Sequence, residues 1–258
     1  MNINSLAATG CKLCFDLPPL DFDFTMAFQP IVDSRSGTIF AHEALARGLQ
    51  GEPASTIFEK VNDDNRYRFD QTCRVKAVAL AARLGLKGYL SINFLPNAVY
   101  KPELCIRATL AAAEQYSFPP DRLLFEVTES ERVEDVGHLK SIINDYKSRG
   151  FLTAIDDFGA GFAGLNLLAE LQTDIVKLDM ALVRNVNEDR IKASIIRGVI
   201  QTCIDLNIRV IAEGVETREE YLCLERMGIN LFQGFYFSRP VFEGLGQIDP
   251  NLFSHALG

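Results

Sequence analysis

Polar residues that can bind a metal ion or a phosphate follow seven short apolar runs of this sequence. With their polar ends, the runs span residues 39–43, 89–93, 123–126, 152–157, 175–179, 210–213 and 231–233. Short continuous hydrophobic runs are typical of buried parallel strands. In a barrel of parallel strands, the carboxyl ends of the strands meet at one face, where active sites form. The sequence therefore predicts one site that is built from several strand ends.

The first four of these ends supply oxygen ligands. They are Glu43, Asn93, Glu126 and Asp156, and Asp157 follows directly. Sets of oxygen ligands favour Mg²⁺ or Mn²⁺ over zinc, and carboxylates packed without a cation would raise one another's pKa. If the chain turns as it leaves the strand, Asp156 and Asp157 could together bridge two ions. Two adjacent divalent ions are a recurring device for cleaving phosphodiesters.

Two basic residues could act on a phosphate. Lys177 could steady a hydroxide or a phosphate oxygen, or it could form a structural ion pair with Asp179, which shares its face of the strand. Arg47 could hold a phosphate with its forked guanidinium, or it could make a surface salt bridge.

The last two runs add three candidates. Glu213 could bind a second metal ion or act as a base, Glu216 could orient the loop before Thr217, and Gln233 closes the series. Taken singly, each carboxylate could be a surface or helix-capping residue. Their succession on strand ends favours a shared site.

Helical patterns alternate with the apolar runs. We predict helices over 54–83, as one or two helices, around 139–146 before Gly150, over 188–203, and from Thr217 to Gly228. The helix over 188–203 is expected to present one apolar face, formed by Ile191, Ile195, Ile196, Val199, Ile200 and Cys203. Thr217 and Glu220 have the spacing of a capping box.

The order of these elements predicts the fold class. Strands that alternate with helices indicate a parallel α/β architecture. Two early strands, 25–32 and 38–44, are separated by only five residues. A parallel crossover needs a dozen or more residues, so these two strands must pair antiparallel. We predict a TIM-like (β/α)8 barrel with one antiparallel strand near the N-terminus.

Length and charge limit the remaining choices. The 258 residues suit one barrel domain, 24–258, preceded by an arm, 1–23. The formal net charge is -8 and Lys and Arg do not cluster, so we expect no DNA or RNA partner. No apolar stretch reaches about 18 residues, so we expect no membrane insertion. The first twelve residues lack the features of a signal peptide, so we expect a cytoplasmic protein.

The cysteines predict little chemistry. Six cysteines in a chain of this length do not make a disulfide framework. Those at 73, 105, 203 and 223 are expected to be small core residues. Cys11 and Cys14 form a Cys-x-x-Cys pair in the arm that could bind a metal, act in redox chemistry or bridge to a partner's arm. No second pair completes a zinc site.

Seven ordered segments together resemble the EAL domain family, the cyclic di-GMP phosphodiesterases. The matching segments are Glu43-Ala44-Leu45 with Arg47, Ser91-Ile92-Asn93, Glu126-Val127-Thr128-Glu129-Ser130, Asp156-Asp157-Phe158-Gly159, Val176-Lys177-Leu178-Asp179, Ala212-Glu213-Gly214-Val215-Glu216-Thr217 and Gln233-Gly234-Phe235. They cover residues of about 25–245. Residues 156–184 and 231–246 are most similar to the branch that is attached to blue-light-sensing flavin domains.

The resemblance implies a TIM-like barrel that hydrolyses one phosphodiester of cyclic di-GMP to linear pGpG. The implied cofactor is Mg²⁺ or Mn²⁺, bound as two ions. The implied roles are metal ligands at Glu43, Asn93, Glu126, Asp156, Asp157 and Glu213, catalytic roles for Lys177, Glu213 and Glu43, substrate contacts at Arg47, Asp179 and Gln233, and loop-orienting roles for Glu129 and Glu216. It also implies a homodimer that acts in bacterial signalling, in processes such as biofilm formation and motility.

Two departures from the family pattern bear on this assignment. Ala160 replaces a threonine in the loop after Asp157, which removes a hydroxyl that could anchor the loop. Phe94-Leu95 stands where Leu-Ser is common, which we interpret as a change of packing. Two alternatives are a catalytically silent cyclic di-GMP receptor or protein-interaction module, and another barrel enzyme such as an enolase-like metal lyase.

Overall fold

The computed structural model describes residues 19–99, 101–128, 135–161 and 164–253. Most of the predicted N-terminal arm, with Cys11 and Cys14, lies outside these residues, as does Glu129. The four remaining cysteines form no disulfide with one another, and Cys105 and Cys203 are buried as predicted.

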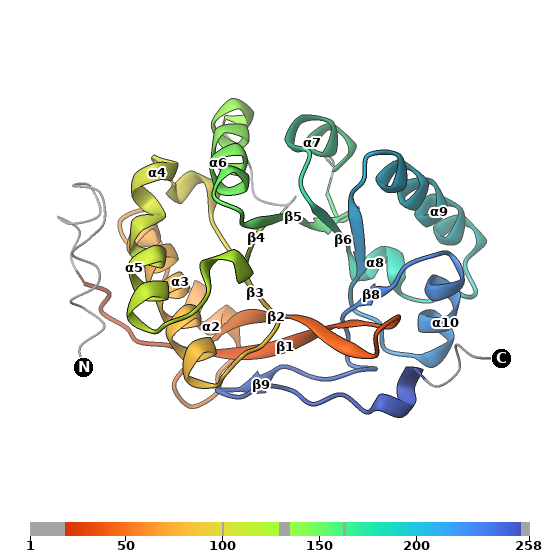
Figure 1. The fold of residues 1–258 in the computed structure, drawn as a ribbon, viewed down its shortest axis with the longest axis horizontal. Coiled ribbons are helices and arrows are strands. Elements are labelled where there is room, and N and C mark those ends of the chain that lie inside the picture. The colour runs from red at the N-terminus through yellow and green to blue at the C-terminus, as the bar shows by residue number, and fades with distance from the viewer. Residues whose placement is uncertain (1–18, 100, 129–134, 162–163, 254–258) are drawn as a thin grey trace.

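Eight strands close a barrel, and a ninth strand pairs outside it (Figure 1). The strands are β1 (Thr25–Asp33), β2 (Thr38–Arg47), β3 (Tyr89–Asn93), β4 (Leu123–Thr128), β5 (Leu152–Phe158), β6 (Ile175–Leu178), β7 (Arg209–Ala212), β8 (Leu231–Phe232) and β9 (Val241–Phe242). Strands β2 to β8 run parallel to one another, and β1 is antiparallel to β2, β8 and β9. The predicted TIM-like barrel with one antiparallel strand is confirmed.

A tight turn joins β1 to β2. The backbone N–H of Gly37 donates to the carbonyl of Asp33 at 2.9 Å, and Gly37 has a φ of +65°. Glycine adopts this left-handed conformation without steric cost. The turn leaves room for no helix, which is why β1 must reverse direction and why the barrel contains one antiparallel strand.

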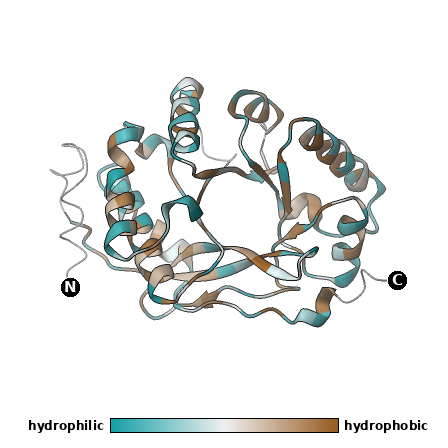
Figure 2. Ribbon diagram, viewed as in Figure 1, coloured by the Kyte–Doolittle hydropathy of each residue, from teal (hydrophilic) through white to brown (hydrophobic). Residues whose placement is uncertain are grey.

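Helices surround most of the barrel. They are α2 (Ala54–Phe58), α3 (Arg66–Arg83), α4 (Pro102–Cys105), α5 (Arg107–Gln115), α6 (Val136–Ser148), α7 (Gly164–Leu171), α8 (Met180–Val183), α9 (Arg190–Asp205) and α10 (Arg218–Arg226). The predicted 54–83 stretch is thus two helices. Figure 2 shows that many of these helices carry both apolar and polar residues. No helix in the described part of the chain combines the length and apolar character needed to cross a membrane.

Helix α9 corrects one prediction. Ile196, Ile200 and Cys203 are buried as expected, but Ile191 is 73% exposed and Ile195 is 47% exposed. Residues five positions apart are about 140° apart around a helix, so the predicted set was too wide for one buried face. The helix begins where the side chain of Asp189 accepts hydrogen bonds from two backbone N–H groups.

A buried glutamate joins α10 to two neighbouring loops. Thr217 and Glu220 form the predicted capping box. Glu220 also accepts hydrogen bonds from the backbone N–H groups of Asn185 at 2.9 Å and Glu216 at 2.9 Å. Glu220 therefore connects the start of α10 to the segment that follows α8, beside the end of the barrel where the predicted site lies.

Glu220→Ala should lower the free energy of unfolding by roughly 2–3 kcal/mol, because it leaves several backbone N–H groups without their acceptor. Urea denaturation measures this change. Glu219→Ala is the control, because Glu219 lies on the same turn and is exposed. Equal midpoints for the two variants would contradict the role assigned to Glu220.

Candidate active site at the carboxyl ends of the strands

The barrel interior has an apolar layer and a polar layer. The apolar layer is Ile31, Ala41, Leu124, Ala154, Ile175, Ile211 and Leu231. Side chains two residues apart on a strand point to the same face. Two positions further along the parallel strands stand Glu43, Glu126, Asp156, Lys177, Glu213 and Gln233. The polar layer therefore lies above the apolar layer, at the carboxyl ends of the strands.

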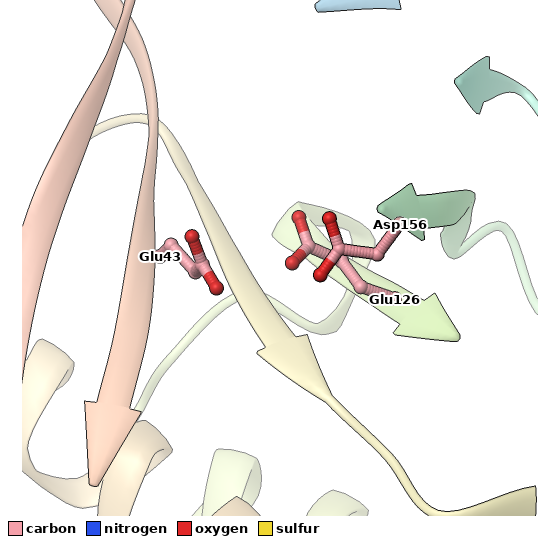
Figure 3. Close-up of side chains that lie close together, drawn as sticks. All are labelled: Glu43, Glu126 and Asp156. Atoms are coloured by element: carbon pink, nitrogen blue, oxygen red, sulfur yellow. The ribbon is translucent and has the colours of Figure 1, made fainter. Parts of the chain in front are cut away.

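Lys177 is the centre of the polar layer. Its Nζ lies 2.6 Å from Glu213 Oε1, 2.8 Å from Glu126 Oε2, 3.0 Å from Asp156 Oδ1 and 3.5 Å from Glu43 Oε2. The Lys177 side chain is only 1% exposed. Figure 3 shows three of these carboxylates, Glu43, Glu126 and Asp156, pointing toward one another inside the barrel. Four strand ends thus deliver carboxylates to one buried ammonium.

The alternative ion pair between Lys177 and Asp179 is wrong. Asp179 follows the end of β6, where its Oδ1 accepts a hydrogen bond from the backbone N–H of Ala181 at 2.8 Å. It thereby caps α8. Lys177 instead pairs with the four carboxylates of the polar layer, because they converge from other strands.

Neutral side chains fix the orientation of two carboxylates. Asn93 Nδ2 donates to Glu43 Oε1 at 2.9 Å, and Gln233 Nε2 donates to Glu43 Oε2 at 2.7 Å. Ser91 Oγ donates to Glu126 Oε1 at 2.5 Å. Each of the two carboxylates is therefore held by hydrogen bonds as well as by charge.

The backbone at Asp157 brings the two adjacent aspartates to one site. The pairing of β5 with β6 shifts register between Ile155 and Phe158, and Asp157 has a φ of +55°. An irregularity of this kind re-aims a side chain, and a left-handed conformation outside glycine often marks a functional position. The turn expected at this strand exit is present, and Asp157 joins Asp156 and Glu213 in a second carboxylate cluster.

Burial and mutual repulsion raise the pKa of three carboxyl groups. Burial is the largest cause in each case. The pKa of Glu126 rises to about 8, with Glu43 and Asp156 adding to the effect and Lys177 opposing it. The pKa of Asp157 rises to about 6, with Asp156 and Asp179 contributing. The pKa of Glu213 rises well above its ordinary value.

The donor set fits divalent cations. Two groups of carboxylate oxygens each lie within 4.8 Å of one another, Glu43 with Glu126 and Asp156, and Asp156 with Asp157 and Glu213. Asn93 Oδ1 is buried and has no hydrogen-bond partner among the described residues, so this oxygen can serve as a ligand. Buried, oxygen-only sites with excess negative charge suit Mg²⁺ or Mn²⁺. Asp156 belongs to both groups and could bridge two ions.

A cavity of about 340 Å³ opens beside the polar layer. Glu43, Asp156, Asp157, Glu213 and Gln233 line it together with Arg47, Glu216, Met180 and Phe235. The guanidinium of Arg47 donates to the carbonyl of Ala46 at 2.7 Å. Arg47 therefore stands at a cavity beside carboxylates, where a phosphate could reach it.

Glu216 forms an ion pair with Arg184 at 2.5 Å, which ties its loop to the end of α8.

Three polar residues of the site were not predicted individually. Ser91 holds Glu126, Gln29 accepts a hydrogen bond from Gln233 at 3.3 Å, and Arg184 pairs with Glu216. Ser91 and Gln29 each stand two residues from another inward-facing residue, Asn93 and Ile31, so the period of the strand could have found them. No comparable signal marks Arg184, because it lies outside the strands.

A family model for the EAL domain matches residues 21–240. The chain belongs to the EAL domain family.

Two relatives from Escherichia coli are each about one-third identical to the chain. The blue light- and temperature-regulated antirepressor BluF of Escherichia coli (strain K12) is 34% identical over 223 residues, which are 86% of this chain and 55% of BluF. The probable cyclic di-GMP phosphodiesterase PdeG of the same organism is 32% identical over 224 residues, which are 83% of this chain and 44% of PdeG. The chain thus spans about half the length of these relatives. The predicted similarity to the blue-light branch is confirmed by BluF.

Solved structures show the same fold. The crystal structure of a standalone versatile EAL protein from Vibrio cholerae O395, in its c-di-GMP bound form, is 58% identical and has a TM-score of 0.88. The match covers 92% of this chain and all of that one. A manganese and cyclic di-GMP complex of BlrP1 from Klebsiella pneumoniae is 38% identical with a TM-score of 0.82, and covers 87% of this chain and 58% of BlrP1.

The stabilisation of this EAL domain by Mn²⁺ should increase with pH. At about pH 5 the raised pKa values of Asp157 and Glu126 keep both groups protonated, so a cation must displace protons in order to bind. At about pH 8 Asp157 is ionised and Glu126 is near its midpoint, so the cost is smaller. Thermal unfolding with and without Mn²⁺ measures the shift in Tm. A shift in Tm that is equal at both pH values would contradict these protonation states.

Asp157→Asn should stabilise the metal-free protein at about pH 8 by roughly 1 kcal/mol, after allowance for solvent screening, because the amide has no charge to bury and none to oppose Asp156 and Asp179. Asparagine tolerates the left-handed backbone. The same change should weaken Mn²⁺ binding. Asp121→Asn, at an exposed position, is the control for chemical denaturation and Mn²⁺ titration. A loss of stability in Asp157→Asn would contradict the expectation that burying the charge of Asp157 costs stability.

Proposed function

We propose that this chain hydrolyses one phosphodiester bond of cyclic di-GMP to give linear pGpG, with Mg²⁺ or Mn²⁺ as cofactor. The observation that carries the proposal is the convergence of carboxylates from separate strands on Lys177, beside the amide oxygen of Asn93, which is buried and has no partner in the part of the chain that the structure describes. The V. cholerae and K. pneumoniae EAL structures in complex with cyclic di-GMP support the choice of substrate.

Two cations are proposed, held by the two carboxylate groups. Glu43, Asn93, Glu126 and Asp156 would hold one ion, and Asp156, Asp157 and Glu213 would hold the other. When bound, the ions supply an activated water and neutralise charge that develops on the phosphate. Ser91 and Gln233 keep the carboxylates oriented through the hydrogen bonds described above.

Lys177 acts as a fixed cation rather than as a base. Burial lowers its pKa, but Asp156, Glu126, Glu213 and Glu43 together raise it well above the ordinary value. The ammonium is therefore always charged at neutral pH, and it would donate to the attacking water or to a phosphate oxygen by giving up one of the three carboxylates within 3.0 Å. Glu213 has a raised pKa in the metal-free protein, so a cation held there would have to displace its proton.

The residues at the mouth of the cavity would contact the substrate. Arg47 can donate to a phosphate oxygen, and Gln233 lines the same cavity. Asp179 follows β6 next to this region, and its charge already acts on Asp157. The loop of Glu216 is held by Arg184. The predicted loop-orienting role of Glu129 lies outside the described residues.

The setting of the reaction is also proposed. Cyclic di-GMP is a bacterial signalling nucleotide, so hydrolysis by this chain would lower the messenger in the cytosol. Residues 24–258 would form the catalytic domain, and a homodimer would be the active form.

A silent receptor or protein-interaction module is the second candidate. BluF, which is 34% identical, is named an antirepressor, so an EAL domain can occur in a protein named for action on another protein. The complete set of carboxylates around Lys177 favours the enzyme.

Incubation of the purified chain with cyclic di-GMP and Mn²⁺ should yield pGpG, read by chromatography, and a chelator should stop the reaction. Glu43→Ala should lower the rate by about a hundredfold, because it removes a ligand and the partner of two amides. Glu114→Ala, an exposed change of the same kind on α5, should keep the full rate.

Activity of Glu43→Ala above about a tenth of the wild-type rate would contradict the assignment of Glu43 as a ligand. Binding of cyclic di-GMP by the wild-type chain without any release of pGpG would instead favour the receptor.

A further inference from the structure

We propose that Asp70 and Arg74, buried in α3, are positioning residues that hold Asn93 in place for metal binding. The inference rests on the proposed function, since it assigns to Asn93 the role of a ligand. It concerns residues outside the polar layer and outside both carboxylate groups.

The segment after Asn93 is held from two sides. On one side, the backbone N–H of Phe94 donates to the carbonyl of Glu126 at 3.0 Å, which extends the pairing of β3 with β4. On the other side, the backbone N–H of Leu95 donates to Asp70 Oδ1 at 3.0 Å. The second hydrogen bond joins the end of β3 to α3, and it is made two residues after the ligand.

The segment is buried on one side and borders a cavity on the other, since Phe94 is only 2% exposed and packs near the rings of Phe125 and Tyr146. Asn93, Phe94 and Leu95 line an apolar cavity of about 360 Å³ between the strand ends and helices α2 and α3. Side chains that border open space lose contacts on that side. The hydrogen bond from Leu95 to Asp70 adds a directional restraint on the α3 side to the packing of Phe94.

Asp70 is itself held by a buried network. Asp70 Oδ2 lies 2.6 Å from Arg74 Nη2, with the two side chains 3% and 1% exposed. Arg74 Nη1 donates to Tyr146 Oη at 2.7 Å. The Arg74 guanidinium also lies 5.6 Å from the ring centroid of Phe94 and 5.7 Å from that of Phe125. The network thus contacts the neighbour of each proposed ligand, Phe94 beside Asn93 and Phe125 beside Glu126.

A purely packing role for Phe94-Leu95 is therefore incomplete. Phe94 offers its ring to Arg74, and Leu95 offers its N–H to Asp70. Because Asn93 also donates to Glu43, a displaced segment would disturb two ligands of the same proposed ion.

The decisive variant is Asp70→Leu combined with Arg74→Met. Replacing both members of a buried ion pair with apolar residues avoids an unpaired charge and is often tolerated. It removes the acceptor of the Leu95 N–H. Leu95→Pro is the second variant, because it deletes the donor and keeps the Asp70–Arg74 pair; the φ of Leu95, -93°, lies about 30° from the value that proline prefers.

A control pair of the same chemistry lies at the opposite end of the barrel, with side chains 37% and 27% exposed. Asp174 accepts a hydrogen bond from the backbone N–H of Thr153 at 2.9 Å and pairs with Lys147 at 3.3 Å. Asp174→Leu combined with Lys147→Met makes the same two kinds of change, away from the polar layer.

Calorimetric titration with Mn²⁺ is the measurement, made well below the Tm of each variant. The Asp70/Arg74 variant and Leu95→Pro should bind Mn²⁺ about ten- to a hundredfold more weakly, the usual effect of losing an outer partner of a ligand. The control should stay within about twofold of the wild type.

Wild-type affinity in the variants of α3 or Leu95 would overturn the proposal and leave the proposed function intact. Equal weakening in the control would also overturn it, since the effect would then be general loss of stability. If the wild-type chain binds no Mn²⁺ at all, the proposed function fails together with this inference, so the two failures are distinguishable.

Discussion

The balance of charge around Lys177 is the constraint on which the rest of the site depends. Four carboxylates lie within 3.5 Å of one ammonium in the barrel interior. When all are ionised, negative charge is in excess, and burial makes that excess costly. The protein can relieve it by keeping protons on groups such as Glu126 and Asp157, or by binding cations. The same arrangement that strains the metal-free protein therefore prepares it for divalent ions.

The barrel tolerates this buried cluster of charges because it separates a polar layer from an apolar layer. Inward-facing residues at the bottom are aliphatic, and those two positions further along the parallel strands are charged or amide-bearing. The apolar layer excludes water from beneath, and the neighbouring amides and hydroxyl satisfy the carboxylates from the side. The strain is thus confined to one face, where strand ends give way to loops that can admit a ligand.

The site also depends on local departures from regular structure. Asp157 adopts a left-handed backbone at an irregularity of β5, which places two sequential carboxylates at the same site. Glu220 and Arg184 tie the loops beyond β6 and β7 together. The network of Asp70 and Arg74 reaches the end of β3 from an outer helix. The positions of the proposed ligands on separate strands thus depend on an irregular backbone at β5 and on polar contacts made between elements.

The sequence by itself determined the barrel, its reversed strand and most of the inward polar residues, though Ser91 and Gln29 were not singled out. Each follows from a local rule: the period of a strand, the minimum length of a crossover and the polar end of each apolar run. Only the tertiary structure decided which partner each residue takes. Lys177 contacts four carboxylates from other strands instead of Asp179. Two isoleucines of the α9 pattern face solvent. Asp70 of α3 accepts a hydrogen bond from Leu95, which follows β3. Contacts between residues far apart in the chain depend on how helices and strands pack, and no local spacing records that packing.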